Sequence, residues 1–120
     1  MLINDFYKIT DEQTGDNVYT CKVVFDTTHD IFKGHFPAQP VVPGVCMLQI
    51  VKELLQMQTG KQLLIRNAGN VKFLQLITPN VEPTLNISWQ QADNAYKVNA
   101  AFKANEAPLF KMDGHFEIMS

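Results

Sequence analysis

One long apolar helix constrains the fold of this chain more than any other feature of its sequence. Residues 44–58 have helical periodicity, and Thr59-Gly60 follows as an end signal, because glycine accepts the left-handed backbone of a helix cap. The polar residues of this run form one stripe, at Gln49, Lys52, Glu53 and Gln56. Apolar side chains cover most of the remaining surface. A helix this apolar must be buried on more than one side, as in a helix wrapped by a sheet.

The segments on both sides of the helix have the alternation of apolar and polar residues that is typical of strands. Before the helix, residues 2–9 and 18–25 are expected to form a hairpin around a turn at 11–17. After it, about four strands are expected, at the following runs: 71–76, 85–90, 96–103 and 110–118. Short turns join these runs, which indicates an antiparallel sheet. The sequence therefore predicts an α+β fold in one domain, residues 1–120.

Composition and charge exclude several classes of protein. The 120 residues are 46% hydrophobic with a net charge of -2 and no basic run, so a nucleic-acid partner is not expected. The longest apolar stretches are too short to span a membrane, and the first residues lack a secretory signal. Cys21 and Cys46 match neither a zinc site nor a redox pair, so reduced thiols and a cytoplasmic location are expected. No ligand cluster or phosphate-cradling glycine loop indicates a metal or organic cofactor.

The segment before the helix carries the residues that suit chemistry. Residues 26–43 lose strand periodicity and contain three prolines, which predicts a rigid, shaped loop with His35 inside it. Pro43 and Gly44 then begin the helix, whose free N–H groups suit a carbonyl oxygen that gains negative charge. A histidine with a near-neutral pKa beside such a donor suits proton removal α to a thioester carbonyl. The other two histidines, His29 and His115, are interpreted as structural.

The runs 29–37 and 40–45 resemble the signature of the 3-hydroxyacyl-acyl-carrier-protein dehydratases of the hotdog superfamily, the FabZ- and FabA-like proteins. Both the Gly34-His35-Phe36-Pro37 and the Pro43-Gly44-Val45 motifs match. Residues 71–79 resemble the next strand and turn of that family. The resemblance implies a hotdog fold, with one long central helix wrapped by an antiparallel sheet. It also implies a dimer whose two sheets join, with two acyl tunnels, each combining the loop of one chain with the helix of the other.

The same resemblance implies roles for individual residues. His35 would be the catalytic base, and the Gly44 N–H would polarise the thioester carbonyl. Phe36, Pro43 and Val45, with Leu48, would contact the acyl group. The implied activity is that of a hydro-lyase, which dehydrates 3-hydroxyacyl chains on acyl carrier protein in fatty-acid or related acyl-chain biosynthesis.

The chain departs from the family pattern at Gln49, where the family has a catalytic carboxylate. An amide can hold a water or the substrate hydroxyl, but it cannot deliver a proton as a carboxylic acid does. Glu53 lies about 6 Å further along the helix axis, and we expect it to be an exposed helix carboxylate. Three functions therefore stay open: a dehydratase with Gln49 as a catalytic residue, an acyl thioesterase, and a non-catalytic acyl-binding subunit that pairs with an active homologue.

Overall fold

The computed structural model describes residues 2–32 and 40–119. Its elements follow in chain order: β1 (Tyr7–Gly15), β2 (Val18–Phe25), the short 3-10 helix η1 (Asp30–Phe32), α1 (Gly44–Thr59), β3 (Gln62–Phe73), β4 (Thr84–Ala92), β5 (Ala95–Ala104) and β6 (Ala107–Met119). Two strands, one long helix and four strands were predicted in this order. The α+β prediction is therefore confirmed.

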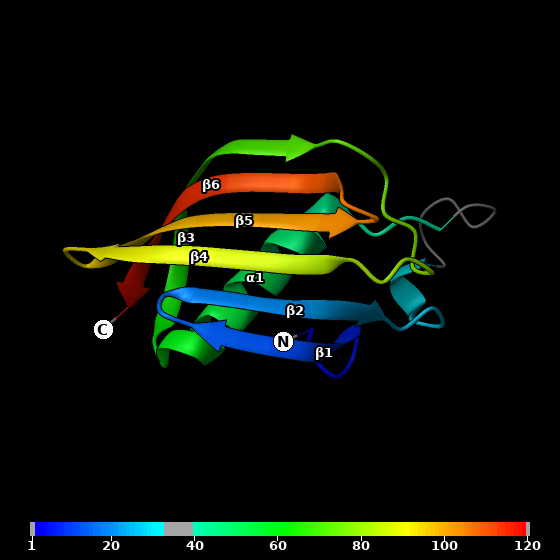
Figure 1. Ribbon diagram of the computed structural model, residues 1–120, viewed down its shortest axis with the longest axis horizontal. Coiled ribbons are helices and arrows are strands. Elements are labelled where there is room, and N and C mark those ends of the chain that lie inside the picture. The colour runs from blue at the N-terminus through cyan, green and yellow to red at the C-terminus, as the bar shows by residue number, and fades with distance from the viewer. Residues whose placement is uncertain (1, 33–39, 120) are drawn as a thin grey trace.

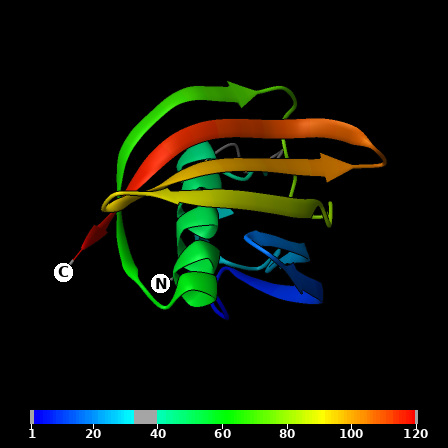
Figure 2. The same ribbon diagram turned by 60° about the vertical axis from the view of Figure 1, so that its left-hand side comes forward.

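The six strands form one antiparallel sheet in the order β1-β2-β4-β5-β6-β3. The sheet curves around α1, which lies inside the curve (Figures 1 and 2). This arrangement is the hotdog fold. In the described ranges, no helix is long and apolar enough to cross a bilayer.

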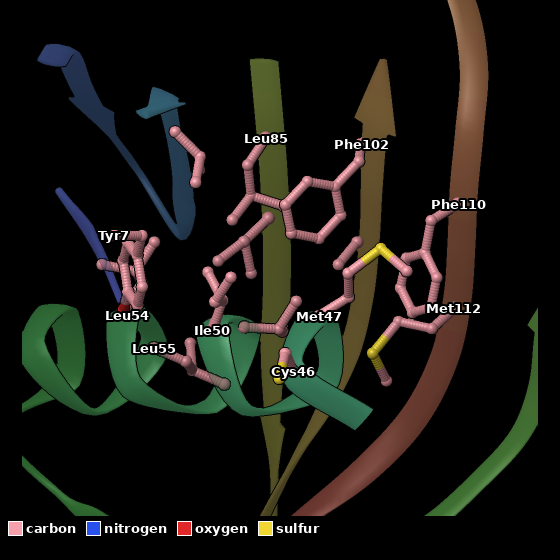
Figure 3. Packing of buried hydrophobic residues seen from close by; sticks show 14 of the residues in the cluster. Tyr7, Cys46, Met47, Ile50, Leu54, Leu55, Leu85, Phe102, Phe110 and Met112 are labelled. Carbon is pink, nitrogen blue, oxygen red and sulfur yellow. The ribbon is translucent and has the colours of Figure 1, made fainter. Parts of the chain in front are cut away.

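The core fills the space between α1 and the inner face of the sheet. Side chains of α1 and of the sheet meet there in Figure 3, among them Met47, Ile50, Leu54, Leu85, Phe102, Phe110 and Met112. The helix residues Ile50, Val51, Leu54 and Leu55 are all fully buried. Burial of so much of the helix surface confirms the expectation that a sheet wraps it.

The ends of α1 are set by its neighbouring residues. Pro43 precedes the first turn with an extended backbone (φ -61°, ψ 141°), which proline adopts readily. Gly60 has a φ of 71°, and its N–H donates to the carbonyl of Gln56 at 2.9 Å. The predicted left-handed glycine cap is therefore confirmed.

Two predicted strands had wrong bounds, and the first of them, β1, begins at Tyr7 instead of residue 2. The turn expected at 11–17 covers only residues 16–17, because β1 continues to Gly15 through an irregularity between Thr10 and Gln13. In addition, β3 begins at Gln62 instead of residue 71 and ends at Phe73 instead of residue 76. Residues 62–70 lack a regular alternation of apolar and polar side chains, and their pairing with β6 shifts register twice. Tertiary pairing, and not local pattern, defines this strand.

Candidate active site

The N-terminal end of α1 opens onto an apolar groove of about 480 Å³. Residues 41–44 and Met47 line one side, and residues 73–77 line the other. The Val42 N–H donates to the carbonyl of Ile77 at 2.7 Å, which ties the segment before the helix to the segment after β3. Two segments far apart in the sequence therefore build the groove at the start of the helix.

Gly44 lets an aromatic side chain pack directly against the start of the helix. A Cβ at this position would overlap the ring of Phe73, which lies against the glycine. Phe73 also packs edge-on against Phe110, with ring centroids 5.3 Å apart, yet it stays 58% exposed. No side-chain cap and no acidic residue occupy the first turn within the part of the chain described here. The positive end of the helix dipole is thus offered to a ligand in the groove.

Only some of the residues predicted to contact the acyl group line the groove. Pro43 and Gly44 line the groove, whereas Val45 is 73% exposed beside the helix start and Leu48 is half-buried. His35 and Phe36 lie outside the described residues, and their roles stay predictions.

Glu53 is fully buried, so the expectation of an exposed carboxylate was wrong. Its Oε2 accepts hydrogen bonds from the Leu2 N–H and the Gln49 side-chain amide, both at 2.8 Å. Its Oε1 accepts from the Ile3 N–H at 2.9 Å and from the Tyr7 hydroxyl at 3.1 Å. The N-terminal segment therefore covers the part of the polar stripe that holds Glu53.

These hydrogen bonds decide the charge of Glu53. Burial alone would raise the pKa of Glu53, but the hydrogen bonds from Leu2, Gln49, Ile3 and Tyr7 outweigh burial and lower its pKa below the ordinary 4.5. Burial, followed by the Glu53 charge, raises the pKa of Tyr7. At neutral pH the pair is therefore a carboxylate and a phenol that donates to it.

Glu53 also orients the Gln49 amide. An ionised carboxylate only accepts hydrogen bonds, so Gln49 must turn its NH₂ group toward it. The Oε1 of Gln49 and the second N–H are left for other partners. Gln49 can therefore bind a hydroxyl or a water, but it has no proton of suitable acidity to give.

His29 has the contacts of a structural residue. Its Nδ1 accepts from the Ile31 N–H at 3.1 Å, and its Nε2 lies 3.2 Å from Asp5 Oδ2. The ring also packs edge-on against Phe6, with centroids 5.3 Å apart. These contacts brace η1 against the N-terminal segment.

The described residues contain no group of three or more histidine, cysteine or acidic side chains that could hold a metal ion. Cys21 and Cys46 are both free and buried. Burial raises the pKa of Cys21 to about 11, so this thiol is a poor nucleophile at neutral pH.

A family model described as ApeI-like, ApeI dehydratase, matches residues 11–113. Among curated relatives, the 3-hydroxyacyl-[acyl-carrier-protein] dehydratase FabZ of Lactobacillus helveticus is 26% identical over 107 residues, which cover 82% of this chain and 72% of that protein. The FabZ of Clostridium acetobutylicum is 32% identical over 56 residues, 41% of this chain and 40% of that protein. The match to FabZ of Rickettsia canadensis covers 57% of its length, so the chain spans about half of these last two relatives.

Solved structures share the fold at low sequence identity. The dehydratase heterocomplex ApeI:P from Xenorhabdus doucetiae matches with a TM-score of 0.76 and 20% identity, over 95% of this chain and 98% of that chain. A hypothetical thioesterase from Streptococcus pneumoniae, solved with coenzyme A, matches with a TM-score of 0.65 and 12% identity, over 98% and 92%. Both likenesses support the hotdog assignment.

Proposed function

The chain belongs to the ApeI-like dehydratase family, and on this basis we propose that it dehydrates 3-hydroxyacyl thioesters carried by acyl carrier protein. The observation that carries the proposal is the start of α1, where Gly44 and the uncapped first turn face an apolar groove. Such a groove suits an acyl chain, and the N–H groups suit the thioester oxygen as it gains negative charge.

The proposed reaction uses His35 twice. As base it takes the proton from the carbon α to the thioester, and the Gly44 N–H stabilises the charge on the carbonyl oxygen. The electron pair then forms the C=C bond while the C–O bond to the 3-hydroxyl breaks. Gln49 holds that hydroxyl or a water through its free amide atoms. Because an amide is no acid, the proton on His35 passes to the leaving hydroxyl and water departs.

We propose that the working unit is a dimer in which the loop of one chain meets the helix of the other. β3 is one edge of the sheet, and it ends beside the start of α1. Four exposed apolar side chains lie around this point, Val45, Phe73, Leu74 and Leu76. Pairing of two β3 edges would join the sheets and cover this surface. The proposed setting is cytoplasmic fatty-acid or related acyl-chain biosynthesis.

The test is enoyl formation by purified protein supplied with 3-hydroxyacyl carrier thioesters of several chain lengths. We expect wild type to give the enoyl product and His35→Ala to lose about 10²–10⁴-fold in rate, the usual contribution of acid–base catalysis. His115→Ala is the matched control, because His115 is exposed on β6 and should be silent. No enoyl product from any chain length, or equal rates for His35→Ala and wild type, would contradict the proposal.

A second function is favoured by Gln49: an acyl-binding subunit that supports an active homologue. The Xenorhabdus doucetiae protein is named as part of a dehydratase heterocomplex. In this case the chain alone would bind acyl carrier thioesters without turnover, and activity would appear only with a partner that supplies the missing carboxylate. Release of free thiol in the same assay would identify a thioesterase instead.

A further inference from the structure

We infer that Glu53 is a positioning residue for the proposed dehydration, because its buried carboxylate fixes the orientation of the Gln49 amide. The inference deepens the proposed function and rests on it. Glu53 itself does not contact the substrate in this account. It acts through Gln49, one helical turn earlier on the same face of α1.

The four hydrogen bonds to Glu53 leave its carboxylate no free lone pair for a further partner. Each of its two oxygens accepts two donors, which fills the roughly four lone-pair sites of a carboxylate. The side chain is also fully buried, so substrate cannot reach it. A catalytic acid or base needs access to the reacting atoms, and Glu53 has none.

The Gln49 amide has two orientations that differ little in shape. Next to a neutral partner, either its oxygen or its NH₂ could face inward. Next to an ionised carboxylate only the NH₂ can do so, since a carboxylate has no proton to donate. Glu53 therefore keeps the Gln49 oxygen turned away from the carboxylate in every molecule, and the proposed substrate would meet that oxygen. This pre-organisation is what a hydroxyl-binding amide needs in order to act in the transition state.

The N-terminal segment holds Glu53 in place. Leu2 and Ile3 donate to it through the backbone, and the Phe6 N–H donates to the Leu2 carbonyl at 2.7 Å, which closes a tight turn. Phe6 is fully buried and packs against Phe32, with ring centroids 5.4 Å apart. The support for Gln49 thus extends from the helix to the first residues of the chain.

A double-mutant cycle with Glu53→Gln and Gln49→Met tests the inference. Each single variant should lower kcat by about 10- to 100-fold, the effect of lost positioning, with little change in KM. The double variant should be no slower than the slower single variant, because both changes remove the same oriented oxygen. A double variant slower by the product of both factors would overturn the inference. It would show that Glu53 acts independently of Gln49.

Tyr7→Phe is the matched control. It removes a donor to Oε1 of Glu53, whereas the Gln49 contact is to Oε2. We expect this variant to lose stability while its kcat stays within about threefold of wild type, since the orientation of Gln49 is kept. A fall in kcat equal to that of Glu53→Gln would show that any loosening of this region slows the reaction, which overturns the inference.

A spectroscopic measurement on wild type tests the Glu53–Gln49 contact without an activity assay. The side-chain NH₂ of Gln49, identified in the ¹H–¹⁵N spectrum by its absence in Gln49→Met, should show one proton shifted downfield and slow to exchange. Two protons at random-coil positions would overturn the inference even if dehydration is observed. Absence of dehydration together with a shifted amide proton would instead reject the proposed function and leave the Glu53–Gln49 pairing supported.

Discussion

Two regions of α1 are built in opposite ways. At its start, Gly44 faces an apolar groove, and the nearby Val45 and Phe73 are exposed. Further along the same helix, Glu53 is buried with both oxygens fully hydrogen-bonded. The start of the helix is left open for a ligand or a second copy, whereas the region around Glu53 is complete within one chain. Changes around Glu53 should therefore cost stability, whereas changes at the start of the helix should lower activity with little loss of stability.

Glu53→Ala should have the largest effect on stability. Four donors would lose a charged acceptor in a buried place, and we expect the free energy of unfolding to fall by about 3 kcal/mol or more. Urea unfolding measures it. Lys52→Ala, the neighbouring helix position, is the control and should change it by less than about 0.5 kcal/mol. Equal losses would mean that the Glu53 network adds nothing to the fold.

Gly44→Ala should lower activity much more than stability. The new methyl group would push the Phe73 ring into the groove, so we expect dehydration to fall about 10- to 100-fold. The free energy of unfolding should fall by only about 1 kcal/mol, because the half-exposed ring has room to move. Gly15→Ala is the control, since the nearest atoms to its Cβ are 4.0 Å away. Full activity in Gly44→Ala would show that the groove is not the binding site.

Acidification should weaken the buried region specifically. Because the pKa of Glu53 is lower in the folded chain than its ordinary 4.5, the unfolded chain binds the proton more readily. The stabilisation from Glu53 is therefore complete above about pH 4.5, the ordinary pKa, and is lost as the pH falls through the lower pKa of the folded chain. Urea unfolding from pH 7 to pH 3 should show a steeper loss in wild type than in Glu53→Gln. Parallel curves would contradict the assignment of this loss to Glu53.

Val45→Ser should have the smallest effect on the single chain. The side chain is 73% exposed, so the free energy of unfolding should change by less than about 0.5 kcal/mol. If the β3 edges pair as proposed, the same change should weaken dimer association in sedimentation velocity. A clear fall in the free energy of unfolding, with dimer association unaltered, would contradict both expectations for Val45.

The same contrast explains how far the sequence could predict this molecule. The helix and its Gly60 cap were predictable because periodicity and a cap residue are local signals. The start of β3 was not, because its pairing with β6 compensates for an irregular pattern. Gly44 was found from its place at the head of the helix after Pro43.

The burial of Glu53 could not be predicted from its surroundings in the sequence. Its position in a polar stripe, at helical spacing from Gln49, is typical of a solvent-facing side chain. The residues that cover it, Leu2 and Ile3, lie 51 and 50 positions away. Both have apolar side chains and donate through the backbone, so no polar residue in the sequence marks this contact. The one local signal was the Gln49–Glu53 spacing of four residues, which favours a side-chain hydrogen bond on a helix.

The most direct test of the account compares Gln49→Glu with wild type in dehydration of the same 3-hydroxyacyl carrier thioester. We predict no gain in rate, because the new carboxylate would face Glu53, which now accepts from Gln49 at 2.8 Å. Two carboxylates this close share one proton, which would lie between them and would not be directed at the substrate. Gln49 would then be a working part of the site. A gain of about 10²-fold or more, the contribution of a restored general acid, would contradict the account and mark the natural chain as the degenerate form.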